Sequence, residues 1–397
     1  MRTETSARSL PLVLRALLAP AFWLERAKGR KRIALAFLYM LVLLFATLLA
    51  WRAASLNGLP DVGEPFDRTA LERINISEPE NAFTFYRQAI ARLKRLSAAE
   101  ARLAGTFQPW GKAPDAARDW LERNREALAL WRQGTERSEA VLVPPSALRF
   151  ETDLGAVEQL GTFARLALLE ATRLQEGGDL EGAWGWYRAV LRSSRHVGMH
   201  GCVSQRLAGY RILFLAGGPI SAWARSPGLD APLLRRALDD MLICESLTPP
   251  ASEAIQIEYL PLIKALDDTK GLVRQGLPGD KVWYHHFPGW LDATLYFYRE
   301  PERSKRVARL VFANWLSQCD RAPPERKAAG AAVEFYQPGP EAAPAARALA
   351  PEALMRWCDS TLILRNFLTT VPNDLRSIDR ETLIWARLEV TLADQLY

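Results

Sequence analysis

The feature that most constrains this chain is an apolar run, IALAFLYMLVLLFATLLAW, which covers residues 33–51 and contains no charged side chain. At a rise of about 1.5 Å per residue, a helix of this length spans roughly 28 Å, close to the thickness of the hydrocarbon core of a bilayer. A helix buried in a soluble core usually carries a polar stripe, and this run has none. The run therefore predicts a transmembrane helix that contacts the lipid bilayer.

The charge of the chain is concentrated before this run. Residues 1–32 hold eight Arg and Lys residues against two Glu residues, so they account for the whole formal net charge of +6. The rest of the chain is formally neutral and lacks the broad basic surface that neutralises phosphates, which predicts no nucleic-acid partner. Basic residues are enriched on the cytoplasmic side of membrane helices. We therefore expect residues 1–32 in the cytoplasm and the body in the periplasm or another exported compartment.

A cleaved signal peptide is the alternative interpretation of the same run. Its basic region would be 32 residues long, and Trp51 and Arg52 lie where small residues should precede a cleavage site. Only Ala53-Ala54-Ser55 offers a place to cut. The sequence favours an uncleaved signal anchor.

The body after the anchor is predicted to be helical. Apolar residues recur at i, i+3, i+4 and i+7, and the alternation that strands need is scarce. The expected helices cover residues 79–98, 114–134, 154–177, 179–197, 202–225, 231–246, 251–274, 288–299, 301–320, 351–370 and 378–396. The expected domains are a cytoplasmic basic segment (1–32), the transmembrane helix (33–51), a linker (52–67), a helical main body (68–321), a Pro/Ala-rich connection (322–350) and a C-terminal helical piece (351–397).

Two nine-residue phrases are nearly repeated. Residues 82–90 read AFTFYRQAI and residues 183–191 read AWGWYRAVL. In each, a small residue is followed after four positions by Tyr and three positions later by another small or aliphatic residue, which places these side chains on one helical face. The packing residues predicted in this way are Ala82, Tyr86, Ala89, Ala183, Tyr187 and Val190.

Residues 171–191 resemble a tetratricopeptide repeat (TPR), a hairpin of two helices. Gly178, Ala183 and Tyr187 match the second helix of that repeat, and Ala171 lies where the first helix carries its small residue. The resemblance implies an irregular TPR-like array of hairpins, or α-solenoid. Together with the apolar run and the helical periodicity, this gives an all-α fold class: a single transmembrane helix followed by the helical-hairpin body. The phrases lie 101 residues apart, close to three TPR periods, although a regular array would repeat about every 34 residues.

Histidine and cysteine residues are the candidates for a metal, redox or disulfide site. His196 and His200 have the i, i+4 spacing that can place two imidazoles on one helical face, but Gly198 and Gly201 indicate that the helix ends there, and no third ligand is evident. We therefore predict no metal site and keep this pair as weak candidates. The cysteines are widely spaced and form no metal or redox motif, so their disulfide pairing is left open: Cys202, Cys244, Cys319 and Cys358.

One aromatic stretch is a candidate binding surface. Residues 282–290, VWYHHFPGW, place aromatic and histidine side chains beside turn residues, and aromatic anchors often dominate binding interfaces. The binding residues predicted on this basis are Trp283, Tyr284, His285, His286, Phe287 and Trp290.

No nucleophile-elbow, zinc-protease, Ser-x-x-Lys, Walker or dinucleotide motif occurs in the sequence. The phrases N-A-x-x-x-Y, beginning at Asn81, and D-W-L-x-x-N-x-x-A-L, beginning at Asp119, resemble uncharacterised envelope proteins of planctomycete-like bacteria. That resemblance implies no activity. We expect no catalysis and no cofactor, and predict a scaffold that binds a protein or envelope component. The alternative is an enzyme or metal-binding protein that uses His196 and His200 with His285 and His286.

Overall fold

A computed structural model describes residues 27–57, 62–97, 107–149, 152–267, 300–317, 319–321, 325 and 362–396. These residues form helices and turns, and their only β-type contact is an isolated bridge between Asn81 and Glu139. The predicted all-α class is confirmed for this part of the chain. The chain divides into two compact units, described separately below: Met1–Pro60 with Trp283–Arg303, and Asp61–Val282 with Ser304–Tyr397.

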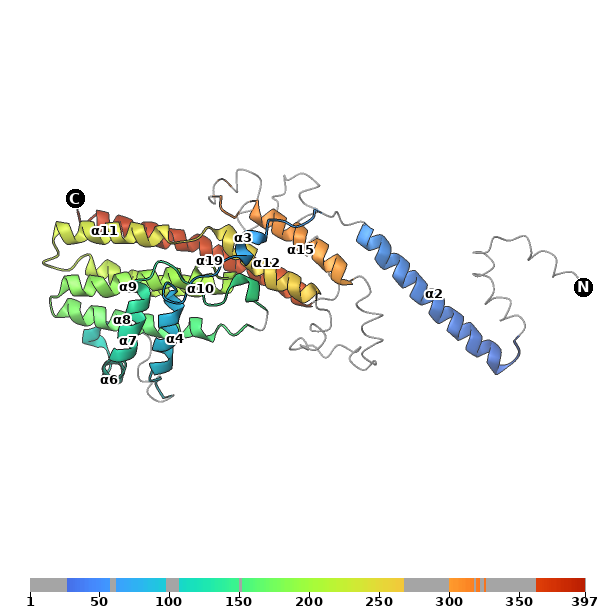
Figure 1. Cartoon of the computed structure of the whole chain (residues 1–397), viewed down its shortest axis with the longest axis horizontal. Coiled ribbons are helices and arrows are strands. Elements are labelled where there is room, and N and C mark those ends of the chain that lie inside the picture. The colour runs from blue at the N-terminus through green and yellow to red at the C-terminus, as the bar shows by residue number, and fades with distance from the viewer. Residues whose placement is uncertain are drawn as a thin grey trace, which may run out of the picture. The chain divides into compact units, whose positions relative to one another are not determined.

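The first unit contains α2, the helix Arg30–Asn57 (Figure 1). Its segment Arg30–Trp51 is long and apolar enough to cross a membrane, and its most apolar window has no buried residue. The Thr47 hydroxyl donates to the Leu43 carbonyl at 2.8 Å, so this polar group is satisfied within the helix. By length and composition, α2 fits both a membrane span and a signal sequence.

Three long helices form the centre of the second unit (Figure 1): α8 (Gly155–Glu176), α9 (Leu180–Gly198) and α10 (Val203–Trp223). Short connections join them, so α9 runs antiparallel to α8 and to α10. Gly178 has a φ of +83°, which allows the sharp turn after α8. Asp179 then caps α9 by accepting a hydrogen bond from the Gly182 amide at 2.8 Å.

The helices before this stack are α3 (Thr69–Glu72), α4 (Ala82–Arg92), α6 (Asp115–Arg123) and α7 (Arg125–Thr135), with short 3₁₀ turns η2 (Trp110–Lys112) and η3 (Pro145–Ala147). The prediction of one helix over 114–134 is wrong, because the chain breaks between α6 and α7 at Asn124. The Asn124 side chain donates to the carbonyls of Trp120, at 2.9 Å, and Lys94, at 3.0 Å. Such side-chain bonds to the backbone compete with helix continuation.

The remaining helices are α11 (Ala231–Ser246), α12 (Ala251–Asp267), α15 (Glu300–Leu316) and α19 (Leu362–Ala393). Helix α19 packs against α10 and α11 (Figure 1). The predicted helices 351–370 and 378–396 are wrong as separate elements, because α19 runs through 371–377. Pro372 cannot donate a helical hydrogen bond, yet the helix continues through it. The predicted connection 322–350 lies outside the described residues except for Glu325.

The two repeated phrases lie in α4 and α9. Their six predicted packing residues are all fully buried: Ala82, Tyr86, Ala89, Ala183, Tyr187 and Val190. Helix α9 forms a hairpin with α8, whereas α4 packs mainly against α7, which is not its neighbour along the chain. Gly134 of α7 permits that contact, because a Cβ there would lie 2.7 Å from Cε1 of Tyr86.

Candidate functional site

The described residues bury thirteen polar side chains, and six of these lie between Ser193 and Arg206. We call this segment, which connects α9 to α10, the 193–206 joint. Buried polar groups are uncommon unless paired, so their concentration marks the joint as the candidate site. The backbones of α9 and α10 lie very close together here. A Cβ at Gly209 of α10 would clash with the Ser194 carbonyl oxygen, so only glycine fits at that position.

His196 belongs to α9 and is fully buried. Its Nδ1 lies 2.7 Å from the hydroxyl of Tyr86, the tyrosine of the first repeated phrase. Burial lowers the pKa of His196 to about 3, and burial also raises the pKa of Tyr86, so both groups are neutral near pH 7. The hydrogen bond between the Tyr86 hydroxyl and Nδ1 of His196 therefore joins two neutral groups, and it connects α4 to α9.

His200 lies beyond the end of α9 and has a φ of +49°, which is uncommon for a residue other than glycine. Its Nδ1 is 2.9 Å from Oε1 of Glu253, on α12, and its Nε2 is 3.4 Å from Oε2 of Glu139. The hydrogen bond to Glu253 is the main cause that raises the pKa of His200. The imidazolium form can donate to both carboxylates at once, so His200 fastens three segments together.

These two histidines do not share a helical face, because α9 ends at Gly198 before His200 is reached. Within the described ranges, no group of three His, Cys, Asp or Glu side chains is arranged to hold a metal ion. The other predicted histidines, His285 and His286, lie outside the described residues, as do Trp283, Tyr284, Phe287 and Trp290. Their role stays a prediction.

The centre of the joint is an ion cluster that attaches the C-terminal helix. Glu381 of α19 pairs with Arg195 of α9, and its Oε2 lies 3.4 Å from Nε of Arg206 on α10. The three side chains are between 2% and 8% exposed, so water screens their charges little. The Arg195 guanidinium also lies 5.0 Å from the ring centroid of Trp385 and donates to Oγ1 of Thr248 at 2.9 Å.

Sequence reasoning missed this cluster. Arg195 follows Leu191 by four positions and precedes Val197, so it falls on the buried face of α9. A charged residue at such a position signals a buried partner. The sequence does not identify the partner, because Glu381 lies in another helix far along the chain.

The described cysteines are buried, and two of them are poor nucleophiles. Cys202 and Cys244 are buried free thiols, and Cys319 is also buried. Burial raises the pKa of both Cys202 and Cys244 to about 12, which keeps them protonated and weakly nucleophilic. Cys358 lies outside the described residues.

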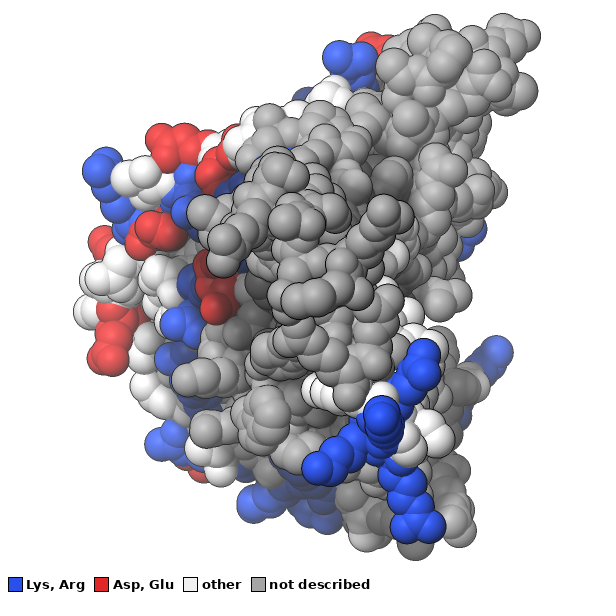
Figure 2. Space-filling model, turned by 90° about the vertical axis from the view of Figure 1, so that its right-hand side faces the viewer, with Lys and Arg blue, Asp and Glu red and all other residues white. Residues whose placement is uncertain are grey.

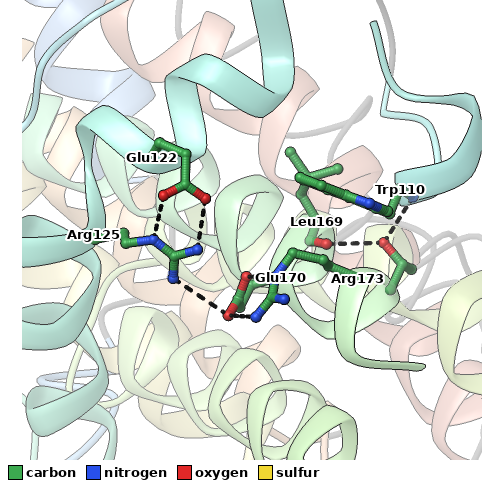
Figure 3. Close-up of polar contacts among 7 residues, drawn as sticks. Trp110, Glu122, Arg125, Leu169, Glu170 and Arg173 are labelled. Carbon is green, nitrogen blue, oxygen red and sulfur yellow. Dashed lines mark hydrogen bonds and ion pairs between the residues drawn. The ribbon is translucent and has the colours of Figure 1, made fainter. Parts of the chain in front are cut away.

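A second polar cluster connects α6, α7 and α8 (Figure 3). Arg125 makes two hydrogen bonds of 2.6 Å to Glu122, and Arg173 makes two of 2.7 Å to Glu170. Arg125 also approaches Glu170 at 3.6 Å, so the buried Glu170 carboxylate receives two guanidiniums. Two parallel hydrogen bonds between a guanidinium and a carboxylate fix the relative position of the helices that carry them.

Close to the second cluster, Thr172 of α8 attaches the η2 turn through Trp110, which Figure 3 labels together with Leu169. Its hydroxyl donates to the Leu169 carbonyl at 3.0 Å and accepts a hydrogen bond from the Trp110 amide, also at 3.0 Å. Like the joint, this region makes polar contacts between separate segments of the chain. Its polar side chains connect one segment of the chain to another.

Comparison with known protein families, curated proteins and solved structures finds no match to this chain.

Proposed function

We propose that the chain is a membrane-anchored helical scaffold whose exported body binds a protein or another envelope component and performs no catalysis. The observation that carries this proposal is α2, whose apolar segment Arg30–Trp51 has the length and composition of a single membrane span.

The distribution of basic residues supports the orientation. Lys28, Arg30, Lys31 and Arg32 are exposed at the start of α2. Figure 2 shows a group of Lys and Arg residues with no Asp or Glu among them at the lower right of the face in view. Basic residues before a first membrane helix favour retention of that side in the cytoplasm. The body would then be exported.

The polar clusters of the body support binding over catalysis. The Glu381 cluster, the Tyr86–His196 pair and the Glu170 cluster each join separate helices. Side chains committed to such contacts stabilise a framework, and helical hairpin frameworks commonly bind partners through their outer surfaces. The hairpin of α8 and α9 is the part of that framework that supports a TPR-like arrangement.

The test of the anchor is a pair of reporter fusions placed after residue 60. Alkaline phosphatase, which folds productively only outside the cytoplasm of bacteria, should be active at this position, and a cytoplasmic β-galactosidase fusion should be inactive. The opposite pair of activities would refute the orientation. Release of the body into the soluble fraction would favour a cleaved signal peptide over an anchor.

The test of binding is crosslinking and mass spectrometry of the full-length protein in its native membrane. The proposal expects reproducible crosslinks from the body to one partner or one envelope component. Crosslinks that remain within the chain, or that scatter in proportion to protein abundance, would contradict a scaffold function.

A further inference from the structure

The repeated phrases share a second feature besides their buried face. At the fourth position each carries an aromatic residue, Phe85 in α4 and Trp186 in α9, and both side chains are partly exposed. Each ring is faced by an arginine from one segment: Cζ of Arg137 is 4.5 Å from the Phe85 ring centroid, and Cζ of Arg132 is 4.4 Å from that of Trp186. Guanidinium groups at these distances make favourable contacts with aromatic faces.

These two arginine–aromatic pairs belong to one continuous surface at the C-terminal end of α7. Arg188 of α9 donates to Oε1 of Glu136 at 3.0 Å, and Glu136 caps the end of α7. Arg192 donates to the carbonyl of Arg137 at 2.9 Å, which holds the segment after α7 against α9. We call the surface formed by these neighbours the α7 surface, and it comprises Phe85, Arg132, Gln133, Glu136, Arg137, Trp186 and Arg188.

The α7 surface carries surplus positive charge. It contains three guanidinium groups and one carboxylate, that of Glu136. Among the described residues, neither Arg132 nor Arg137 makes an ion pair with a carboxylate, whereas Arg188 reaches both Glu136 and, at 3.7 Å, Asp240. This surplus contrasts with the formally neutral body. Two arginines are held in place by aromatic rings with their hydrogen-bonding capacity toward carboxylates unused.

The chemistry of these side chains defines the partner. A guanidinium fork matches the two oxygens of a carboxylate, and an arginine already held against a ring loses less conformational freedom on binding. The partly exposed Phe85 and Trp186 rings can cover aliphatic atoms of the same ligand. The neutral body disfavours a long polyanion such as nucleic acid, which needs an extended basic surface. Short acidic stretches that include apolar atoms fit the site best.

We infer that the α7 surface binds an acidic peptide segment of a partner protein. This inference rests on the proposed scaffold function and specifies where, and through which chemistry, the scaffold holds its partner.

The test places a photocrosslinking amino acid at Gln133, an exposed position between the two arginines, in the full-length protein in its native membrane. Mass spectrometry should locate the crosslink in a peptide with more Asp and Glu than Lys and Arg. In the double variant Arg132→Gln with Arg137→Gln, crosslinking should fall roughly tenfold or more, because one hydrogen bond between ionised groups is worth at least that factor in affinity.

The matched control is Arg211→Gln with Arg235→Gln, which removes two exposed arginines from α10 and α11. Crosslinking from Gln133 should be unchanged in this control, and a synthetic Glu-Ala copolymer should compete while a Lys-Ala copolymer should not. Crosslinks to phospholipid, to glycan or to a peptide without surplus acid would overturn the inference, as would equal yields in both double variants. A partner crosslinked only from other surfaces would overturn the inference and leave the scaffold function standing.

Discussion

Replacing Glu381 with Gln tests how the C-terminal helix is held. The carboxylate is 4% exposed and serves two buried guanidiniums, so its neutralisation leaves Arg195 and Arg206 without their counter-charge. Breaking a buried ion pair from one side costs about 3–5 kcal/mol. Arg195 keeps its contact with the Trp385 ring, and Arg206 keeps the carbonyl of Pro250 at 3.1 Å, so the lower end of that range applies.

For a unit of this size, about 3 kcal/mol corresponds to a decrease in melting temperature of roughly 6 °C. Intrinsic tryptophan fluorescence of the full-length protein in nanodiscs measures the melting temperature, and hydrogen exchange measures the protection of the α19 amides, which should decrease first. Glu181→Gln is the control, because its pair with Arg236 is exposed and should change stability by no more than about 0.5 kcal/mol. A Glu381→Gln melting temperature equal to that of the control would refute the buried cluster as the attachment of α19.

Three further substitutions use the same melting assay. Glu253 and Glu139 raise the pKa of His200, so their stabilisation is complete below the unfolded pKa of about 6.5 and is lost as pH rises through the folded value. His200→Gln should therefore lower the melting temperature more near about pH 6 than near about pH 9, and an equal loss at both would contradict this linkage. Gly134→Ala should destabilise by about 1–3 kcal/mol, because its Cβ would lie 2.7 Å from Tyr86. Gly161→Ala has nothing within 4 Å of its Cβ and should stabilise α8 by about 0.5–1 kcal/mol, so the same sign for both alanines would refute the contact.

Local sequence patterns predicted which parts of the chain are helical far better than how those helices end or associate. The end of α8 and the start of α9 were predicted within a residue, because Gly178 and Asp179 act on their own neighbours. The break at Asn124 was missed because its side chain bonds to Lys94, a partner that local spacing does not reveal. The continuity of α19 through Pro372 was missed because proline is a strong local signal against a helix interior.

In the candidate site, too, local features were predicted and contacts between distant helices were not. Gly198 and Gly201 predicted that the helix ends between His196 and His200, and α9 does end at Gly198, so the two histidines have different partners. Their actual partners, Tyr86 and Glu253, lie in α4 and α12. No local period encodes contacts of that kind, because they depend on how helices far apart in the sequence are packed.

The repeated phrases show how one pattern can carry two kinds of information. Its first, second and fifth positions, represented in α4 by Ala82, Phe83 and Tyr86, are fully buried, so packing alone accounts for their identity. The fourth position differs, because Phe85 and Trp186 remain partly exposed and each faces an arginine, while Trp186 also packs against the core. Substitutions at the buried positions should therefore act through stability and affect every function equally. Substitutions at the fourth position should lower the melting temperature less and should also act on partner binding, which makes this position the one where the two contributions can be separated experimentally.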